Sequence, residues 1–171
     1  SYEEDIVKST QEIVRIKSVE EEKKGDMPFG EGPFKALEYA LSLAENMGFK
    51  TKNFDNYAAH ADLGDGEETV GILVHLDVVP EGEDWIYPPY GAEVHDGKIY
   101  GRGINDDKGP AIACMYAMKA LKESGVPLSR KIRIIFGTNE ETGWGCMKHY
   151  FANEKAPDMA VTRDAELPVI Y

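Results

Sequence analysis

The chain has 171 residues, 42% of them hydrophobic, and a formal net charge of −12 at pH 7. That length allows one domain with a hydrophobic core. The negative charge argues against a nucleic-acid partner, since nucleic acids are bound by positively charged surfaces. No apolar run approaches the ~20 residues of a membrane span, and the acidic first residues do not resemble a signal peptide. We therefore expect a cytoplasmic protein that binds neither nucleic acid nor a membrane.

Helical and strand patterns alternate along the chain. Apolar residues recur at helical spacing over residues 3–16. A second helix is expected to open at Gly32-Pro33 and to stop at Gly48. Loose alternation over residues 53–63 predicts a strand. The remaining predicted elements, in chain order, are a buried strand over 70–74, a loop over 80–91, a short strand over 98–100, a helix over 108–124, a buried strand over 131–137, a helix over 144–152 and a strand over 159–162.

Strands that alternate with helices predict an α/β fold in which some strands are parallel. Ligands bind at the carboxyl ends of the strands in open sheets of this kind. His75 and Asp77 follow the strand over 70–74 and face the same side of an extended chain. His75 could therefore bind a metal while Asp77 fixes its ring, as metal-bound histidines usually require. The alternative is a core histidine beside a surface aspartate.

Residues 101–109 combine three glycines, two aspartates and a lysine directly ahead of a predicted helix. Glycines let the backbone turn sharply and approach a site. The ordinary explanation for Asp106 is a structural N-cap. An N-cap alone does not explain this composition, so Asp106 is a second candidate for metal binding.

Glu140, Glu141 and Asp164 also follow predicted strands. Two adjacent carboxylates without Lys or Arg among them are unfavourable unless a cation or proton compensates; the alternative is a solvated acidic turn. One histidine with several carboxylates and no thiolate suits Zn²⁺, Mn²⁺ or Co²⁺ in a hydrolytic site. The histidines interpreted as non-ligands are His60, His95 and His149.

Three motifs together resemble one family closely. They are residues 75–80 (His-Leu-Asp-Val-Val-Pro), 100–110 (Tyr-Gly-Arg-Gly-Ile-Asn-Asp-Asp-Lys-Gly-Pro) and 137–142 (Gly-Thr-Asn-Glu-Glu-Thr). The resemblance is to the zinc metallopeptidase family of carboxypeptidase G, acetylornithine deacetylase, succinyl-diaminopimelate desuccinylase and the aminoacylases. Residues 28–30 and 164–168 look most like its bacterial dipeptidase V (Xaa-His dipeptidase) branch.

The resemblance implies a three-layer α/β/α fold of the zinc-exopeptidase (aminopeptidase/phosphorylase-hydrolase) type. It also implies two zinc ions ~3.5–4 Å apart, with Mn or Co as possible substitutes, and a cis peptide bond between Asp106 and Asp107. The implied roles are as follows: His75 and Asp164 bind one zinc, Glu141 binds the other, Asp106 bridges both, Asp77 orients His75, and Glu140 is the general base acting on a water held between the metals.

The implied activity is hydrolysis of the peptide bond in dipeptides. A deacylase of N-acyl amino acids and a non-catalytic metal-binding fragment remain alternatives. A nucleotide-binding domain is poorly supported, because no Gly-rich phosphate loop directly follows the first buried strand.

Two departures from the family pattern matter. Position 163 is Arg, where this branch usually has Pro before the ligand Asp. The family also has a lid domain that contributes an oxyanion-stabilising His, and a later segment that supplies a final His ligand; no residue here can stand for either. Residues 1–171 are therefore expected to be the first segment of the catalytic domain, to be inactive alone, and to self-associate through an open apolar strand edge.

Overall fold

The computed structural model describes residues 1–162 and residue 164. Arg163, and residues 165–168 of the motif that resembles dipeptidase V, lie outside these described residues. Within them, none of the helices combines the length and the apolar character needed to cross a membrane.

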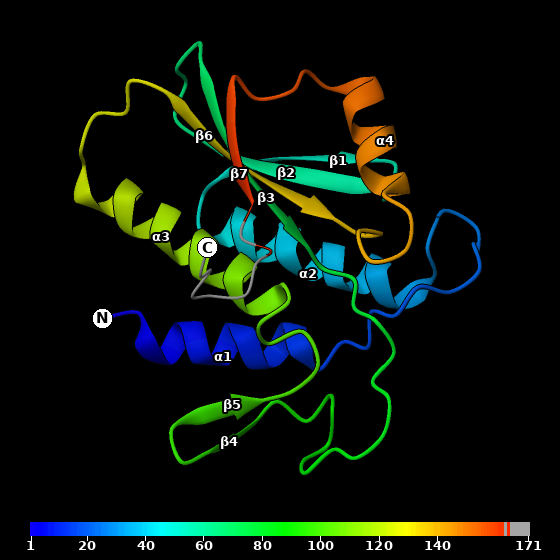
Figure 1. Cartoon of the computed structure of the whole chain (residues 1–171). Coiled ribbons are helices and arrows are strands. Elements are labelled where there is room, and N and C mark those ends of the chain that lie inside the picture. Colours follow the sequence, from blue (N-terminus) through cyan, green and yellow to red (C-terminus); the bar gives the residue numbers. More distant parts are fainter. Residues whose placement is uncertain (163, 165–171) are drawn as a thin grey trace, which may run out of the picture.

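Among the described residues, five strands form a mixed sheet at the centre of the molecule (Figure 1). In sheet order they are β1 (Lys50–Phe54), β2 (Ala58–Leu63), β6 (Lys131–Gly137), β3 (Thr69–His75) and β7 (Met159–Thr162). β2 runs antiparallel to both β1 and β6. β3 pairs in the parallel sense with β6 on one side and β7 on the other. The parallel half of the sheet is therefore β6, β3 and β7.

Helices cover both faces of this sheet. They are α1 (Glu3–Val14), α2 (Glu31–Asn46), α3 (Lys108–Ser124) and α4 (Gly145–Asn153). In Figure 1, α2 and α3 lie against one face with α1 packed beside α3, and α4 lies on the opposite face. Alternation along β6 produces this arrangement, because Ile134 and Phe136 join the core with α1, α2 and α3, whereas Ile135 joins the core with α4. The expected three-layer α/β/α architecture is confirmed.

A glycine lies just beyond each of two helices, at the position where the sequence predicted the end of that helix. Gly48, just beyond α2, has φ +75°, and Gly125, the C-cap of α3, has φ +69°. Because glycine has no Cβ, it adopts this left-handed conformation with little penalty, and the chain can leave the helix sharply.

The predicted bounds of α3, β6 and β7 agree with the structure. The single strand predicted over residues 53–63 is wrong, because the chain turns at Asp55 and Asn56 and pairs back on itself as the β1–β2 hairpin. Both turn residues have positive φ, 51° and 61°. Aspartate and asparagine tolerate this conformation better than other non-glycine residues, and the alternation of apolar residues gave no sign of the turn.

A second sheet of two strands stands apart from the main one (Figure 1). Its strands are β4 (Glu93–His95), which was missed, and β5 (Lys98–Tyr100), which was predicted. β4 has only three residues, too few to show a period. The loop over 80–91 packs on this hairpin, and the Tyr87 ring stacks on His95 with centroids 3.9 Å apart.

Candidate metal centre

The parallel half of the sheet brings three chain segments to one edge. His75, the last residue of β3, pairs with Gly137, the last residue of β6, and Thr162 ends the neighbouring β7. Residues that follow these strands therefore leave the sheet side by side at its carboxyl edge. Glu140 lies just beyond β6 and Asp164 just beyond β7, so the topology itself accounts for their approach to His75.

Asp106 reaches the same edge from the glycine-rich turn ahead of α3. The peptide bond between Asp106 and Asp107 is cis, as the family resemblance implied. Gly103 has φ +87°, and a Cβ there would lie 2.9 Å from Val78 Cγ1, so the turn packs closely on the segment after β3. Asp107 is the N-cap residue of α3, and its side chain makes no capping hydrogen bond. The alternative of an N-cap role for Asp106 is therefore wrong.

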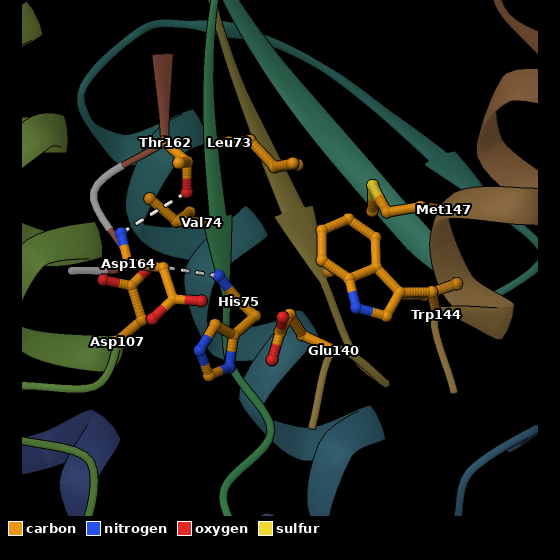
Figure 2. Close-up of a pocket in the computed structure, with 11 residues that line it drawn as sticks. Leu73, Val74, His75, Asp107, Glu140, Trp144, Met147, Thr162 and Asp164 are labelled. Atoms are coloured by element: carbon orange, nitrogen blue, oxygen red, sulfur yellow. Dashed lines mark hydrogen bonds between the residues drawn. The ribbon is translucent and has the colours of Figure 1, made fainter. Parts of the chain in front are cut away.

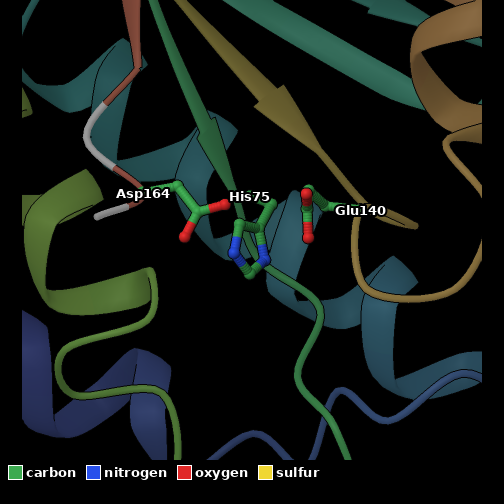
Figure 3. Close-up of side chains that lie close together, drawn as sticks. All are labelled: His75, Glu140 and Asp164. Carbon is green, nitrogen blue, oxygen red and sulfur yellow. The ribbon is translucent and has the colours of Figure 1, made fainter. Parts of the chain in front are cut away.

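Two overlapping groups of side chains bring their ligand atoms within 4.8 Å of one another. One group is His75, Glu140 and Asp164, shown in Figure 3, and the other is His75, Asp106 and Glu141. Every residue that the sequence indicated as a metal ligand belongs to one of these groups. Glu140 belongs to the first group, so position alone does not separate a general base from a ligand.

The His75 ring is buried and is oriented to bind through Nε2. Its Nδ1 lies 3.0 Å from the main-chain oxygen of Asp77 and 3.5 Å from Asp77 Oδ1. A main-chain oxygen can only accept, so Nδ1 is the donor and Nε2 faces the other carboxylates. Nε2 lies 2.8 Å from Oδ1 of Asp106. A metal-bound histidine usually has this arrangement, with its second nitrogen donating to the protein.

Asp77 also holds the loop that follows β6. Its side chain is buried, and its two oxygens accept the main-chain N–H groups of Glu140 and Glu141, each at 3.1 Å. One carboxylate therefore joins the end of β3 to the two glutamates. The sequence suggested only its contact with His75, because the bond to Glu140 spans 63 residues.

The gathered acids shift the pKa values of the site. Burial opposes protonation of His75, but its hydrogen bond to Asp77 and the surrounding carboxylates outweigh burial and raise the pKa of His75 to about 10. Burial and neighbouring acids also raise the pKa values of Glu140 and Glu141. Carboxylates placed this close together are stabilised by a cation, which relieves their mutual repulsion.

Asp107 adds a buried carboxylate that the sequence did not single out. Its Oδ2 accepts the main-chain N–H of His75 at 3.2 Å. Its Oδ1 has no hydrogen-bond partner among the described residues, and burial raises the pKa of Asp107 to about 7. A buried carboxylate oxygen without a partner is costly, so Asp107 favours a positive charge at this edge.

A small pocket, partly open to solvent, adjoins the carboxylates (Figure 2). Glu140 and Asp164 lie on its acidic side, and Trp144 and Met147 contribute to an apolar wall. Trp144 has φ 58°, a conformation that non-glycine residues rarely adopt, and the sequence gave no signal of it. An apolar wall lowers the local dielectric constant and so strengthens interactions between charges.

The other histidines lie outside both groups of candidate ligands. His60 is buried in β2, and its Nδ1 lies 2.7 Å from the hydroxyl of Tyr150. His95 and His149 stack on tyrosine rings. These surroundings agree with their interpretation as non-ligands.

The side chains at this edge fit a divalent metal. The donor set is one imidazole nitrogen with several carboxylate oxygens. Among the described residues, no Lys or Arg forms an ion pair with Asp106, Glu140, Glu141 or Asp164. The unpartnered oxygen of Asp107 points to the same need for positive charge. Such a donor set suits Zn²⁺, Mn²⁺ or Co²⁺.

A model of one protein family matches this part of the chain. The family is described as peptidase family M20/M25/M40, and the match covers residues 71–167. The matched residues include all the candidate ligands and make up more than half of the chain. The chain therefore belongs to peptidase family M20/M25/M40.

Known proteins of similar sequence are longer. The chain is 46% identical over 169 residues to the putative dipeptidase YtjP of Bacillus subtilis, and 43% identical over 168 residues to the Beta-Ala-Xaa dipeptidase of Lactobacillus delbrueckii subsp. lactis. These matches cover 98% and 96% of this chain but only 36% of each relative. Human carnosine dipeptidase 1 superposes with a TM-score of 0.82 at 26% identity, over 96% of this chain and 39% of that one.

Proposed function

We propose that residues 1–171 are the first segment of the catalytic domain of a metal-dependent dipeptidase, whose substrate is a small peptide. The observation that carries this proposal is the pair of ligand groups that share His75 at the carboxyl edge of the sheet. Family membership and the similarity to relatives named as dipeptidases support the choice of reaction. A cytoplasmic location stays a prediction.

Zinc is the proposed metal, with manganese or cobalt as possible substitutes. We propose that His75 and Asp164 hold one ion, that Glu141 holds a second, and that Asp106 bridges them. When bound, the metals supply a positive charge that polarises the scissile carbonyl and acidifies water. Asp77 keeps Nε2 of His75 directed at the site through its contacts with Nδ1.

Glu140 is the proposed general base. It takes a proton from water as the water oxygen bonds to the carbonyl carbon, and it gives that proton to the leaving amine when the C–N bond breaks. Burial and the nearby acids raise the pKa of Glu140 in the metal-free site, and bound cations would lower it again. Its main-chain N–H is held 3.1 Å from Asp77 Oδ1, so the side chain starts from a fixed backbone.

The chain spans 36% of its two bacterial relatives, and other parts of the active site are proposed to lie beyond it. These parts are a final histidine ligand, a lid domain and a donor for the oxyanion. Loss of one oxyanion donor typically lowers the rate by ~10²–10³. We therefore expect little or no peptidase activity from residues 1–171 alone.

The test is a comparison of substrates with the full-length gene product. Dipeptides, N-acetyl amino acids and N-succinyl amino acids are assayed before and after treatment with a chelator, and again after Zn²⁺, Mn²⁺ or Co²⁺ is restored. We expect the highest kcat/KM for dipeptides and loss of activity on chelation. Preferred cleavage of N-acyl amino acids would support a deacylase instead, and activity that survives complete metal removal would contradict the proposal.

A further inference from the structure

Residues 16–20, in the connection between α1 and α2, contact three of the chain segments that lead into the candidate metal centre: the one after β3, the one ahead of α3 and the one after β6. We propose that this stretch, which we call the positioning segment, fixes the positions of those chain segments relative to one another. The inference rests on the proposed metal site. It contains no proposed ligand, and it lies outside residues 71–167 that match the family model.

Ser18 holds the segment that follows β3. Its side chain is fully buried, and its Oγ donates to the main-chain oxygen of Leu76 at 2.6 Å. Its own main-chain oxygen accepts the N–H of Val78 at 3.1 Å. These two bonds fix the backbone on either side of Asp77. Because Asp77 contacts Nδ1 of His75, Ser18 acts on the imidazole through Asp77.

Ile16 holds the start of α3. Nζ of Lys108 donates to the main-chain oxygen of Ile16 at 2.7 Å, and Lys108 is fully buried. A buried amino group requires its hydrogen bonds, so this contact ties the first turn of α3 to the positioning segment. Asp106 lies only two residues before Lys108, and its position depends on where α3 begins.

Glu20 holds the loop that carries the glutamates. The hydroxyl of Thr142 donates to Oε2 of Glu20, and it accepts a bond from Nδ2 of Asn139 at 2.6 Å. Glu140 and Glu141 lie between Asn139 and Thr142 in the sequence. The two glutamates are therefore held by Asp77 through their N–H groups and by Glu20 through the end of their loop.

The positioning segment is itself fixed by α2 and by the loop over 80–91. A Cβ at Gly32 would lie 2.1 Å from the main-chain oxygen of Lys17, so only glycine lets α2 approach this closely. The Lys17 ammonium pairs with Glu81 at 2.7 Å. Because α2 and the loop over 80–91 both contact Lys17, the positioning segment has a fixed position of its own. It can therefore hold the chain segments of the metal centre in place.

Ser18→Ala tests the inference, with Ser9→Ala as a matched control. Ser9 is also buried, and its hydroxyl lies 3.0 Å from that of Tyr116, a contact that involves no candidate ligand. Both variants lose a buried hydroxyl group, but only Ser18→Ala alters the positioning segment. Amide hydrogen exchange and zinc affinity by calorimetry are measured on the 171-residue chain, with Ser18→Thr as a conservative variant that keeps the hydroxyl.

We expect Ser18→Ala to speed exchange at Val78 and at residues 140–141, and to weaken zinc binding about tenfold or more, a typical cost of disturbing a ligand's support. Ser9→Ala should leave both readouts unchanged, and Ser18→Thr should restore them. Equal exchange at these amides in Ser18→Ala and Ser9→Ala would overturn the inference. If the unaltered chain binds no zinc, the proposed metal site fails, and the exchange data alone then decide whether the segment positions the loops.

Glu20→Ala provides a second test if Ser18→Ala does not fold. Glu20 lies on a loop, and the truncation removes its contact with Thr142 but leaves the Ser18 bonds in place. We expect faster exchange at residues 140–141 and unchanged exchange at Val78. Exchange equal to that of the unaltered chain at 140–141 would contradict the proposed role of Glu20 and, with it, the inference.

Discussion

Asp77 contacts His75 through two of its atoms, since Nδ1 of the ring lies 3.0 Å from the main-chain oxygen and 3.5 Å from Oδ1 of the carboxylate. The same carboxylate accepts the N–H groups of Glu140 and Glu141. The side chain that orients the imidazole thus also fixes both glutamates, and a change at Asp77 is expected to disturb both ligand groups.

Asp77→Asn should weaken metal binding while the fold persists. The amide keeps the shape of the side chain. However, its NH₂ group would face one of the main-chain N–H groups whose hydrogen bond an Asp77 oxygen now accepts, and two donors cannot bond to each other. We expect zinc affinity to fall by ~10–100-fold, as for other residues that support a ligand. Calorimetric titration measures this, with Asp65→Asn as a control, because Asp65 is exposed and pairs with Lys50. Equal affinity in the two variants would remove Asp77 from this role.

Glu140→Gln should abolish the dipeptide turnover that we propose for the full-length protein and leave the zinc content nearly intact. The amide keeps the size of the side chain but cannot accept a proton, and general-base catalysis typically contributes ~10²–10⁴-fold. Glu141→Gln is the comparison, because it should lower the zinc content. Activity assays and metal analysis together separate the roles. Turnover like that of the natural enzyme would exclude Glu140 as the base, and loss of zinc would make it a ligand.

His60 should make stability depend on pH. Burial and the charge of Arg133 lower the pKa of His60 to about 4, whereas an unfolded chain has a histidine pKa of ~6.5. Between these values the unfolded state binds more protons, so stability falls as the pH falls from 6.5 towards 4. The loss between pH 6.5 and pH 5 should be about 1.5 kcal/mol. Urea unfolding at both pH values should show a larger decrease for the unaltered chain than for His60→Gln, and equal decreases would contradict the assignment.

Tyr150→Phe should destabilise the packing of α4 on the sheet. The Tyr150 hydroxyl lies 2.7 Å from Nδ1 of His60 and accepts a bond from Nη1 of Arg133 at 3.4 Å. All of these groups are buried, so removal of the hydroxyl leaves polar atoms without a partner. We expect the free energy of unfolding to fall by ~1–3 kcal/mol. An unchanged urea midpoint would show that the hydroxyl is not needed.

The fold was predictable where burial dominates the pattern. The strands over 70–74 and 131–137 lie between helical layers. The first appears in the sequence as a continuous apolar run, and the second is rich in isoleucine, with Ile132, Ile134 and Ile135. The β1–β2 hairpin was not predictable in this way, because it depends on the left-handed conformation of Asp55 and Asn56. β4 was too short to show a period.

The candidate ligands were predictable because parallel strands bring their carboxyl ends to one edge. Their supports were not, because these depend on main-chain contacts between distant segments. Asp107 binds the N–H of His75, and Ser18 binds the backbone at Leu76 and Val78. Such contacts leave no period or motif in the sequence, so only the folded chain reveals them.

Zinc should bind unequally to the two proposed positions on this chain. His75 belongs to both ligand groups, but its Nε2 can bind only one ion. We assign it to the ion held with Asp106 and Asp164, which leaves the second ion only the carboxylates of Asp106 and Glu141, and these are poorer zinc ligands without a histidine. Calorimetric titration with Zn²⁺ should therefore show one tight and one weak event. Two equally tight events would contradict this assignment.

Anomalous diffraction from crystals of this chain grown with Zn²⁺ would locate the proposed metal site. We expect the strongest peak at the carboxyl edge of the parallel strands, ~2.0–2.2 Å from Nε2 of His75 and from carboxylate oxygens of Asp106 and Asp164. A weaker peak is expected between Asp106 and Glu141. Zinc bound only elsewhere, for example at His95 and Glu93, whose side chains lie 2.7 Å apart, would contradict the claim that His75 is the centre of the metal site.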